Sequence, residues 1–89
     1  MSNKRSRSVG VFDLRALGKR LRELRGFDLT QEEFADELRI GQSQLSKYER
    51  GVVAPSAEIL FYVKKRFGVS IDWLLTGEGE KHQAGNIRE

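Results

Sequence analysis

The sequence predicts an all-α domain of five short helices, and three observations support that class. Apolar residues recur at helical spacing, and the clearest stripe is Leu14, Leu17, Leu21 and Leu24. Capping residues and glycines punctuate the chain at short intervals. No stretch alternates apolar and polar residues with period two for long enough to indicate a sheet. Eighty-nine residues are enough for one domain with one modest core.

The first two expected helices have clear boundaries. The first carries the leucine stripe, and Gly26 is placed to end it. The second, over about 31–38, begins in LTQEEF, where Thr30 can cap the helix while the Glu33 side chain reaches back to the Thr30 backbone N–H. This reciprocal capping box gives the second helix a well-defined start.

Three further helices follow at short intervals. The third lies in GQSQLSKYERG, and Gly51 can close it in the left-handed conformation. Ser56 can cap a fourth helix, and Gly68 ends it. The apolar residues of that helix are Ile59, Leu60, Val63 and Phe67. Ser70 opens a short fifth helix, IDWLL, which Gly77 ends.

The composition excludes several classes of protein. No cysteine is present, which rules out disulfides and thiolate metal sites. No apolar run approaches the roughly 20 residues of a membrane span, and no apolar segment follows the basic start MSNKRSRSVG, so it is not a secretory signal. His82 is the single histidine, which argues against a metal centre or a nucleophile pair. We expect a cytoplasmic protein that is not an enzyme and needs no metal, cofactor or small-molecule ligand.

Positive charge is concentrated at the start of the chain. Residues 1–25 contain eight Lys or Arg against two acidic residues, a net charge of +6, whereas residues 26–89 contain eight against eleven, a net charge of −3. This asymmetry suits a protein that meets a polyanion with one side. A solvated basic tail explains it equally well.

The second and third helices form a distinctive pair. Because only about three residues join them, they must cross steeply, and Ala35 is small enough for the close contact. Leu45 and Tyr48 can pack inward on the third helix, which leaves a polar outer face. That face comprises Ser43, Ser46, Lys47 and Arg50, with Gln42 and Gln44 on its shoulders. A helix presented in this way matches the width of a DNA major groove.

QEEFADELRIGQSQLSKYERG, followed by PSAEILFYVKKRFGVSIDWLLTGEG, resembles the helix-turn-helix domain of lambda- and 434-type repressors, the broad Xre-like family of regulators. The resemblance covers about residues 13–79, between a flexible basic arm at 1–12 and a polar tail at 80–89. The final segment EGEKHQAGNIRE, residues 78–89, lacks periodicity, and we expect it to be frayed or disordered. It implies a five-helix lambda repressor-like fold with the helix-turn-helix at helices two and three. It also implies a transcriptional regulator, usually a repressor, that binds a palindromic operator in double-stranded DNA as a homodimer.

The resemblance places base-reading side chains on the third helix, at Gln42, Ser43, Ser46 and Lys47, with Gln44 as a weaker candidate. Their chemistry agrees, since glutamine can bond adenine N6 and N7 and lysine can donate to guanine O6 and N7. Gln31 resembles the family glutamine that binds a phosphate and braces its helix-three partner, here Gln42. Further phosphate candidates are Arg50 and the arm residues Lys4, Arg5 and Arg7.

Three features leave alternatives open, and Glu49 has one expected role. Arg39 stands where the family usually has glycine, so it must adopt a left-handed backbone or shift the turn by one residue to use Gly41; it is also a minor phosphate candidate. Tyr48 is expected in the core, and it would face outward only if the third helix were rotated. Glu49 is expected to pair with an Arg or Lys, as the family's acid does. The charge run KKR at 64–66 is interpreted as a solvated face more readily than as a second contact site.

A role in binding protein is the main alternative to operator binding. The same fold occurs in antitoxins, which bind a toxin as well as DNA, and in protein-bridging coactivators. A partner-binding helix would carry apolar anchors on its exposed face, and the third helix has none there. For the dimer interface, the sequence suggests the region of Ile71, Trp73, Leu74 and Leu75 with the tail, although Trp73 is better interpreted as core.

Overall fold

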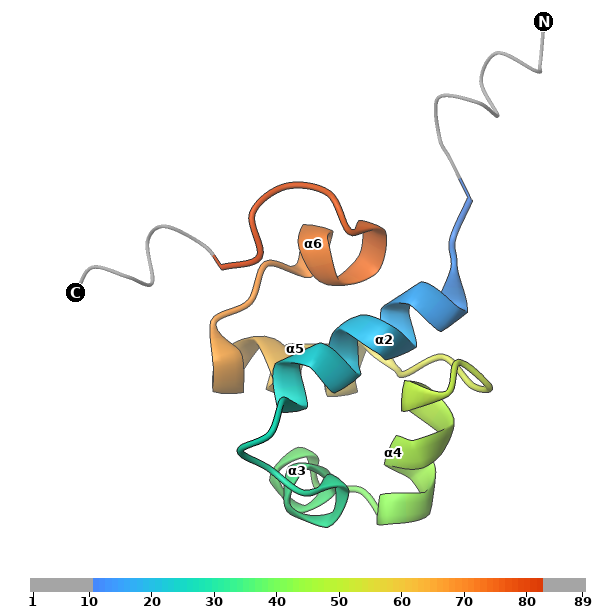
Figure 1. The fold of residues 1–89 in the computed structure, drawn as a ribbon, viewed down its shortest axis with the longest axis vertical. Coiled ribbons are helices and arrows are strands. Elements are labelled where there is room, and N and C mark those ends of the chain that lie inside the picture. The colour runs from blue at the N-terminus through green and yellow to red at the C-terminus, as the bar shows by residue number, and fades with distance from the viewer. Residues whose placement is uncertain (1–10, 83–89) are drawn as a thin grey trace, which may run out of the picture.

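The computed structural model describes residues 11–82, which form five α-helices and no strand. The helices are α2 (Leu14–Arg25), α3 (Gln31–Leu38), α4 (Gln42–Glu49), α5 (Ala57–Phe67) and α6 (Ile71–Thr76). Figure 1 shows α3 and α4 together at one end of the molecule, with α2 crossing above them and α6 on the far side of α2. The predicted all-α class with five helices is confirmed.

Short polar side chains cap four of these helices. Asp13, Thr30, Ser56 and Ser70 each accept a hydrogen bond from the backbone N–H three residues further on. At Thr30 the predicted capping box is confirmed, because Thr30 Oγ1 accepts from the Glu33 N–H at 3.0 Å and Glu33 Oε1 accepts from the Thr30 N–H at 3.0 Å. The sequence did not predict the Asp13 cap. The remaining helix, α4, begins after Gly41 without a side-chain cap.

One hydrophobic core lies between all five helices. Its fully buried side chains are Phe34, Leu17, Leu21, Leu38, Leu45, Leu74, Val63 and Val69. The predicted leucine stripe of α2 therefore faces inward, with Leu14 and Leu24 packed at the margin of the core. Tyr48 is 6% exposed, and Trp73 packs against the core while remaining half-buried, as the sequence suggested for both residues.

α2 lies unusually close to the second half of α4. At Gly18 a Cβ atom would stand 2.5 Å from the Glu49 carbonyl oxygen and 2.6 Å from that of Tyr48, distances that a real side chain does not tolerate. At Gly51, directly after α4, a Cβ would stand 2.7 Å from the Arg15 Cα. Both glycines thus allow the two helices to touch through their backbones.

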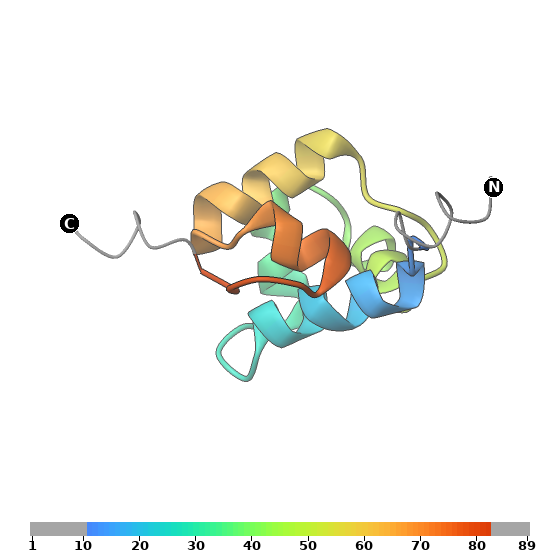
Figure 2. The same cartoon turned by 90° about the horizontal axis from the view of Figure 1, so that it is seen from above.

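The segment 77–82, here called the C-terminal strap, folds back onto α6 and α2. The Ser70 N–H donates to the Lys81 carbonyl at 2.7 Å, and His82 forms an antiparallel bridge with Val69. The Lys81 ammonium lies 2.8 Å from a Glu23 carboxylate oxygen. Figure 2 shows the strap running alongside α6. The expectation of a frayed or disordered end from residue 78 is therefore corrected for residues 78–82, where Glu78, Lys81 and His82 make contacts with the body. Residues 83–89 lie outside the described part.

Candidate nucleic-acid interface

The predicted polar face of α4 is present as an exposed surface. Leu45 and Tyr48 are buried on the inner side, whereas Gln42, Ser43 and Lys47 are exposed on the outer side. Ser46 is half-buried and accepts a hydrogen bond from the Arg50 Nε at 3.2 Å. Arg50 itself is exposed, so its remaining guanidinium N–H groups are available to a ligand. The structure thus brings these candidates together on one helix.

Gln44 differs from the other base-reading candidates. Its side-chain amide donates to the Tyr48 hydroxyl at 3.1 Å, one turn along the same helix, and the residue is half-buried. This bond satisfies the Tyr48 hydroxyl near the edge of the core. The Gln44 amide is therefore already engaged within the protein.

A chain of side-chain hydrogen bonds, here called the relay, connects α2 to the start of α4. Arg25 donates from Nε and Nη2 to the two carboxylate oxygens of Glu49, at 2.9 Å each. Glu49 Oε1 also accepts from the Gln31 Nε2 at 3.0 Å. Gln31 Oε1 in turn accepts from the Gln42 Nε2 at 3.2 Å. The relay restrains the Gln42 amide, because one of its two N–H groups donates to Gln31; the second N–H and the amide oxygen of this exposed residue can still meet a ligand.

The ion pair at the inner end of the relay is largely removed from water. The Glu49 side chain is 4% exposed and the Arg25 side chain 17%. The hydrogen bond to Glu49 raises the pKa of the Arg25 guanidinium above its ordinary value, against the opposing effect of burial. The expected basic partner of Glu49 is Arg25, 24 residues away on α2.

The turn between α3 and α4 places Arg39 in the left-handed region, which is one of the two geometries expected from the sequence. Arg39 has φ 64° and ψ 39°, which is the left-handed region, and it is the single non-glycine residue with positive φ within 11–82. The Ile40 N–H donates to the Ala35 carbonyl at 3.0 Å, which closes α3. The turn is therefore not shifted to Gly41. The Arg39 side chain is exposed.

The cations at 64–66 are engaged with the body of the protein. Arg66 pairs with Glu37 on α3, with 2.6 Å between the Arg66 Nε and a carboxylate oxygen. The Lys64 ammonium donates to the Val69 carbonyl at 3.4 Å, and the Lys65 ammonium lies 5.9 Å from the centre of the Phe61 ring. Lys65 and Arg66 are exposed, as expected for a solvated face, whereas Lys64 is half-buried. The arm candidates Lys4, Arg5 and Arg7 lie outside the described residues.

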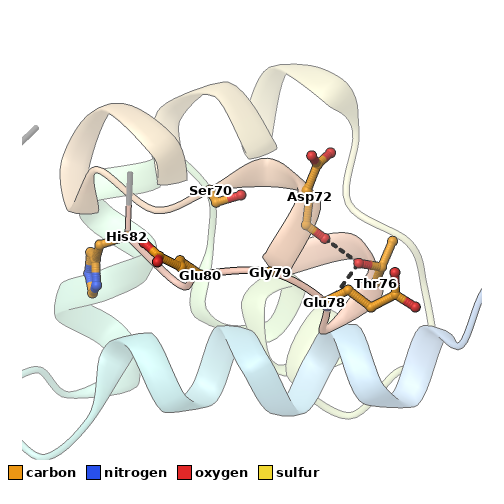
Figure 3. A pocket seen from close by; sticks show the side chains of 7 residues that line it. All are labelled: Ser70, Asp72, Thr76, Glu78, Gly79, Glu80 and His82. Carbon is orange, nitrogen blue, oxygen red and sulfur yellow. Dashed lines mark hydrogen bonds between the residues drawn. The ribbon is translucent and has the colours of Figure 1, made fainter. Parts of the chain in front are cut away.

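A shallow hollow beside α6 has the opposite electrostatic character. Its lining residues are Ser70, Asp72, Thr76, Glu78, Gly79, Glu80 and His82. In Figure 3 the three carboxylates point in different directions, and the Thr76 hydroxyl bonds the Asp72 carbonyl and the Glu78 N–H. Over residues 11–82 no group of three or more His, Cys, Asp or Glu side chains could hold a metal ion. This acidic hollow would repel phosphate, so it does not extend the candidate interface.

Comparisons with known proteins give one consistent family. The family model described as helix-turn-helix matches residues 19–74. The HTH-type transcriptional activator BcrR of Enterococcus faecalis is 43% identical over 61 residues, which is 67% of this chain and 30% of BcrR. The HTH-type transcriptional regulator ImmR of Bacillus subtilis strain 168 is 43% identical over 63 residues, 67% of this chain and 48% of ImmR.

Two further comparisons extend this result. Antitoxin PezA of Streptococcus pneumoniae is 40% identical over 55 residues, 61% of this chain and 35% of PezA. The crystal structure of the clp gene regulator ClgR from Corynebacterium glutamicum superimposes with a TM-score of 0.60 at 34% identity, over 67% of this chain and 65% of ClgR. The chain thus spans about a third to a half of the length of BcrR, ImmR and PezA. No helix within residues 11–82 has the length and apolar character needed to cross a membrane.

Proposed function

The chain belongs to the helix-turn-helix family, and on that premise we propose that it is a sequence-specific transcriptional regulator of double-stranded DNA. The observation that carries this proposal is the exposed polar face of α4, whose first residue, Gln42, is held by the relay. Two relatives named as transcriptional regulators support it. The five-helix lambda repressor-like fold presents α4 at one end of the molecule, where it can enter a major groove.

The proposed readout assigns a contact to each side chain on α4. The Gln42 amide would bond an adenine edge, and the Lys47 ammonium would donate to guanine O6 and N7. Ser43 and Ser46 can bond either bases or phosphate, and Gln44 contributes least because Tyr48 already holds its amide. The proposed phosphate contacts are Gln31 and Arg50, with Lys4, Arg5 and Arg7 of the arm. These contacts require neither a metal nor a cofactor.

We also propose the working form and the sign of regulation. One domain reads only about four to six base pairs, which is too few for useful specificity, so a homodimer on a palindrome is the proposed form. Repression is the sign that the resemblance to the lambda- and 434-type repressors favours. A cytoplasmic location follows from DNA as the partner.

The test is selection of binding sites from random DNA duplexes with the purified protein at two salt concentrations. The expected result is enrichment of a palindrome whose half-sites lie about 10 base pairs apart, one helical turn. The double variant Gln42→Ala/Lys47→Ala is the matched control and should lose the enrichment. Weak, salt-sensitive binding of all duplexes by the unaltered protein, without enrichment, would contradict the proposal. A reporter gene behind the selected site would then distinguish repression from activation.

An antitoxin or protein-bridging role is the second candidate, and the similarity to PezA favours it. In that case a partner protein should accompany the chain at a fixed ratio when it is purified from its native cell. The α4 surface argues for DNA, because its exposed residues are polar and offer no apolar anchor to a partner helix. A stoichiometric partner together with failure to select any DNA sequence would favour the second candidate.

A further inference from the structure

α2 carries three exposed cations that no contact described above uses. Arg15, Lys19 and Arg22 follow one another at steps of four and three residues, so they share one face of the helix. Within residues 11–82 their side chains form no hydrogen bond and no ion pair. The other two cations of α2 are occupied, since Arg20 donates to the Leu74 carbonyl at 2.7 Å and Arg25 is part of the relay. The three free cations are here called the α2 cation row.

Backbone contacts place this row beside the base-reading helix. Gly18 lies one turn from both Arg15 and Arg22 and packs directly on the Glu49 and Tyr48 carbonyls of α4. The backbone of Arg15 meets Gly51, the residue that follows Arg50. Arg22 lies one turn before Arg25, which binds Glu49. The row therefore flanks the helix-helix contact on the open side of α2, next to α4.

The charge around the row is strongly uneven. α2 contains five basic residues and one acidic residue, Glu23, a net charge of +4. The Glu23 carboxylate is paired with Lys81. In contrast, α3 contains four acidic residues and no basic one. The row therefore presents positive charge that no neighbouring carboxylate of α2 neutralises, which is the electrostatic footprint of a polyanion site.

We infer that the α2 cation row binds the phosphate backbone of the same DNA whose bases α4 contacts. The row extends over eight residues, which is about 10 Å along the helix. Phosphates on one strand repeat at about 3.4 Å of axial rise, so a row of this length can serve two or three of them. The row itself has no apolar member, and the exposed Phe27 near Lys19 and Arg22 does not supply the helically spaced apolar anchors that a docked protein helix would need. This inference rests on the proposed function and adds a contact surface outside the helix-turn-helix itself.

The experiment measures the dissociation constant for the selected operator duplex as a function of salt concentration. Lys19→Gln/Arg22→Gln should reduce the slope of log K against log[salt] by about two, since each lost phosphate contact removes about 0.9. Adding Arg15→Gln should bring the reduction to almost three. Affinity should fall by a similar factor on the operator and on a scrambled duplex, because phosphate contacts do not distinguish sequences.

Lys65→Gln/Arg66→Gln on α5 is the matched control, because it removes the same charge away from α4. Glutamine preserves helix propensity at these exposed positions, and thermal melting verifies that each variant remains folded. An equal reduction of slope in the two double variants would reveal a general charge effect and overturn the inference. An unchanged slope in the α2 variant would also overturn it, and would favour an acidic protein segment as the partner of the row. The proposed function is tested separately, by operator selection with the unaltered protein. If selection succeeds and the salt slopes do not change as expected, the inference fails while the proposed function stands.

Discussion

Gln42 is the residue at which the base-reading surface and the interior of the protein meet. Its amide is exposed, yet the Gln31 bond at 3.2 Å fixes its orientation before any DNA arrives. A side chain ordered in advance loses less entropy on binding. Gln42→Ala is therefore expected to weaken operator binding by about 1–3 kcal/mol, measured by fluorescence anisotropy with labelled duplexes.

Gln44→Ala is the matched control for Gln42→Ala, because it removes the same amide from the same helix. Its amide is held by Tyr48, so the effect on operator affinity should be small. A loss on scrambled DNA as large as the loss on the operator would show that Gln42 contacts the backbone and not a base.

The Arg25–Glu49 pair has a structural role that can be tested in the absence of DNA. Arg25→Met would leave a carboxylate that is 4% exposed with the Gln31 amide as its remaining side-chain partner. Breaking a buried pair from one side costs about 3–5 kcal/mol, so the free energy of unfolding in urea should fall by that amount.

The double variant Arg25→Met/Glu49→Leu is the matched test of the cause. Replacing both charges with apolar groups removes the unpaired carboxylate, so the double variant should regain most of the stability that Arg25→Met loses. If the double variant were as unstable as the single variant, packing of the Arg25 stem would explain the loss.

At the scale of elements, the turn between α3 and α4 contains measurable backbone strain. A side chain in the left-handed region costs about 1–2 kcal/mol, whereas glycine adopts it freely but loses about 0.5–1 kcal/mol of chain entropy. Arg39→Gly should therefore raise the free energy of unfolding by about 0.5–1 kcal/mol in urea titrations. Arg39→Ala removes the same charge but keeps the Cβ, so it should give no increase. Equal gains from both variants would mean that the charge, not the backbone, is unfavourable.

At the contact between α2 and α4, glycine is required, and we expect its replacement to lower the free energy of unfolding. Alanine is the better helix former by about 1 kcal/mol, so Gly18→Ala would stabilise an isolated α2. In this fold the new Cβ would stand 2.5 Å from the Glu49 carbonyl oxygen. The helices must then separate, and we expect a loss of about 1–3 kcal/mol in thermal or urea unfolding. Lys19→Ala, one residue further along α2, is the exposed control and should leave stability almost unchanged.

The elements differ in how far the sequence determines them. The capping box at Thr30 joins residues three apart, so local pattern was sufficient to predict it. The partner of Glu49 lies 24 residues away, and that of Lys81 lies 58 residues away, distances over which spacing gives no information. The sequence could not decide between a left-handed Arg39 and a turn shifted to Gly41, because the choice depends on how α3 packs on α4. The role of each α4 side chain on DNA remains a prediction.

At the scale of the whole molecule, the C-terminal strap connects the last helix to the first. Ending the chain after Gly77 would remove the Ser70–Lys81 backbone bond, the Lys81–Glu23 pair and the Lys81 contact with the Trp73 ring. Together these are worth about 1–2 kcal/mol. The melting temperature should fall by about 4–8 °C for each kcal/mol lost. Ending the chain after His82 retains every one of these contacts and is the control; equal melting temperatures for the two truncations would contradict the role of the strap.

The local caps have a consequence for the speed at which the chain acquires its structure. Four helices begin at a side chain that bonds a backbone N–H three residues away, so each start can form without closing a long loop. Proteins dominated by such short-range contacts fold in microseconds to milliseconds. The Lys81–Glu23 pair joins residues 58 positions apart, so it can form and contribute stability only after α2 and α6 have packed together. We therefore expect rapid formation of the helical body, with closure of the strap as its final step.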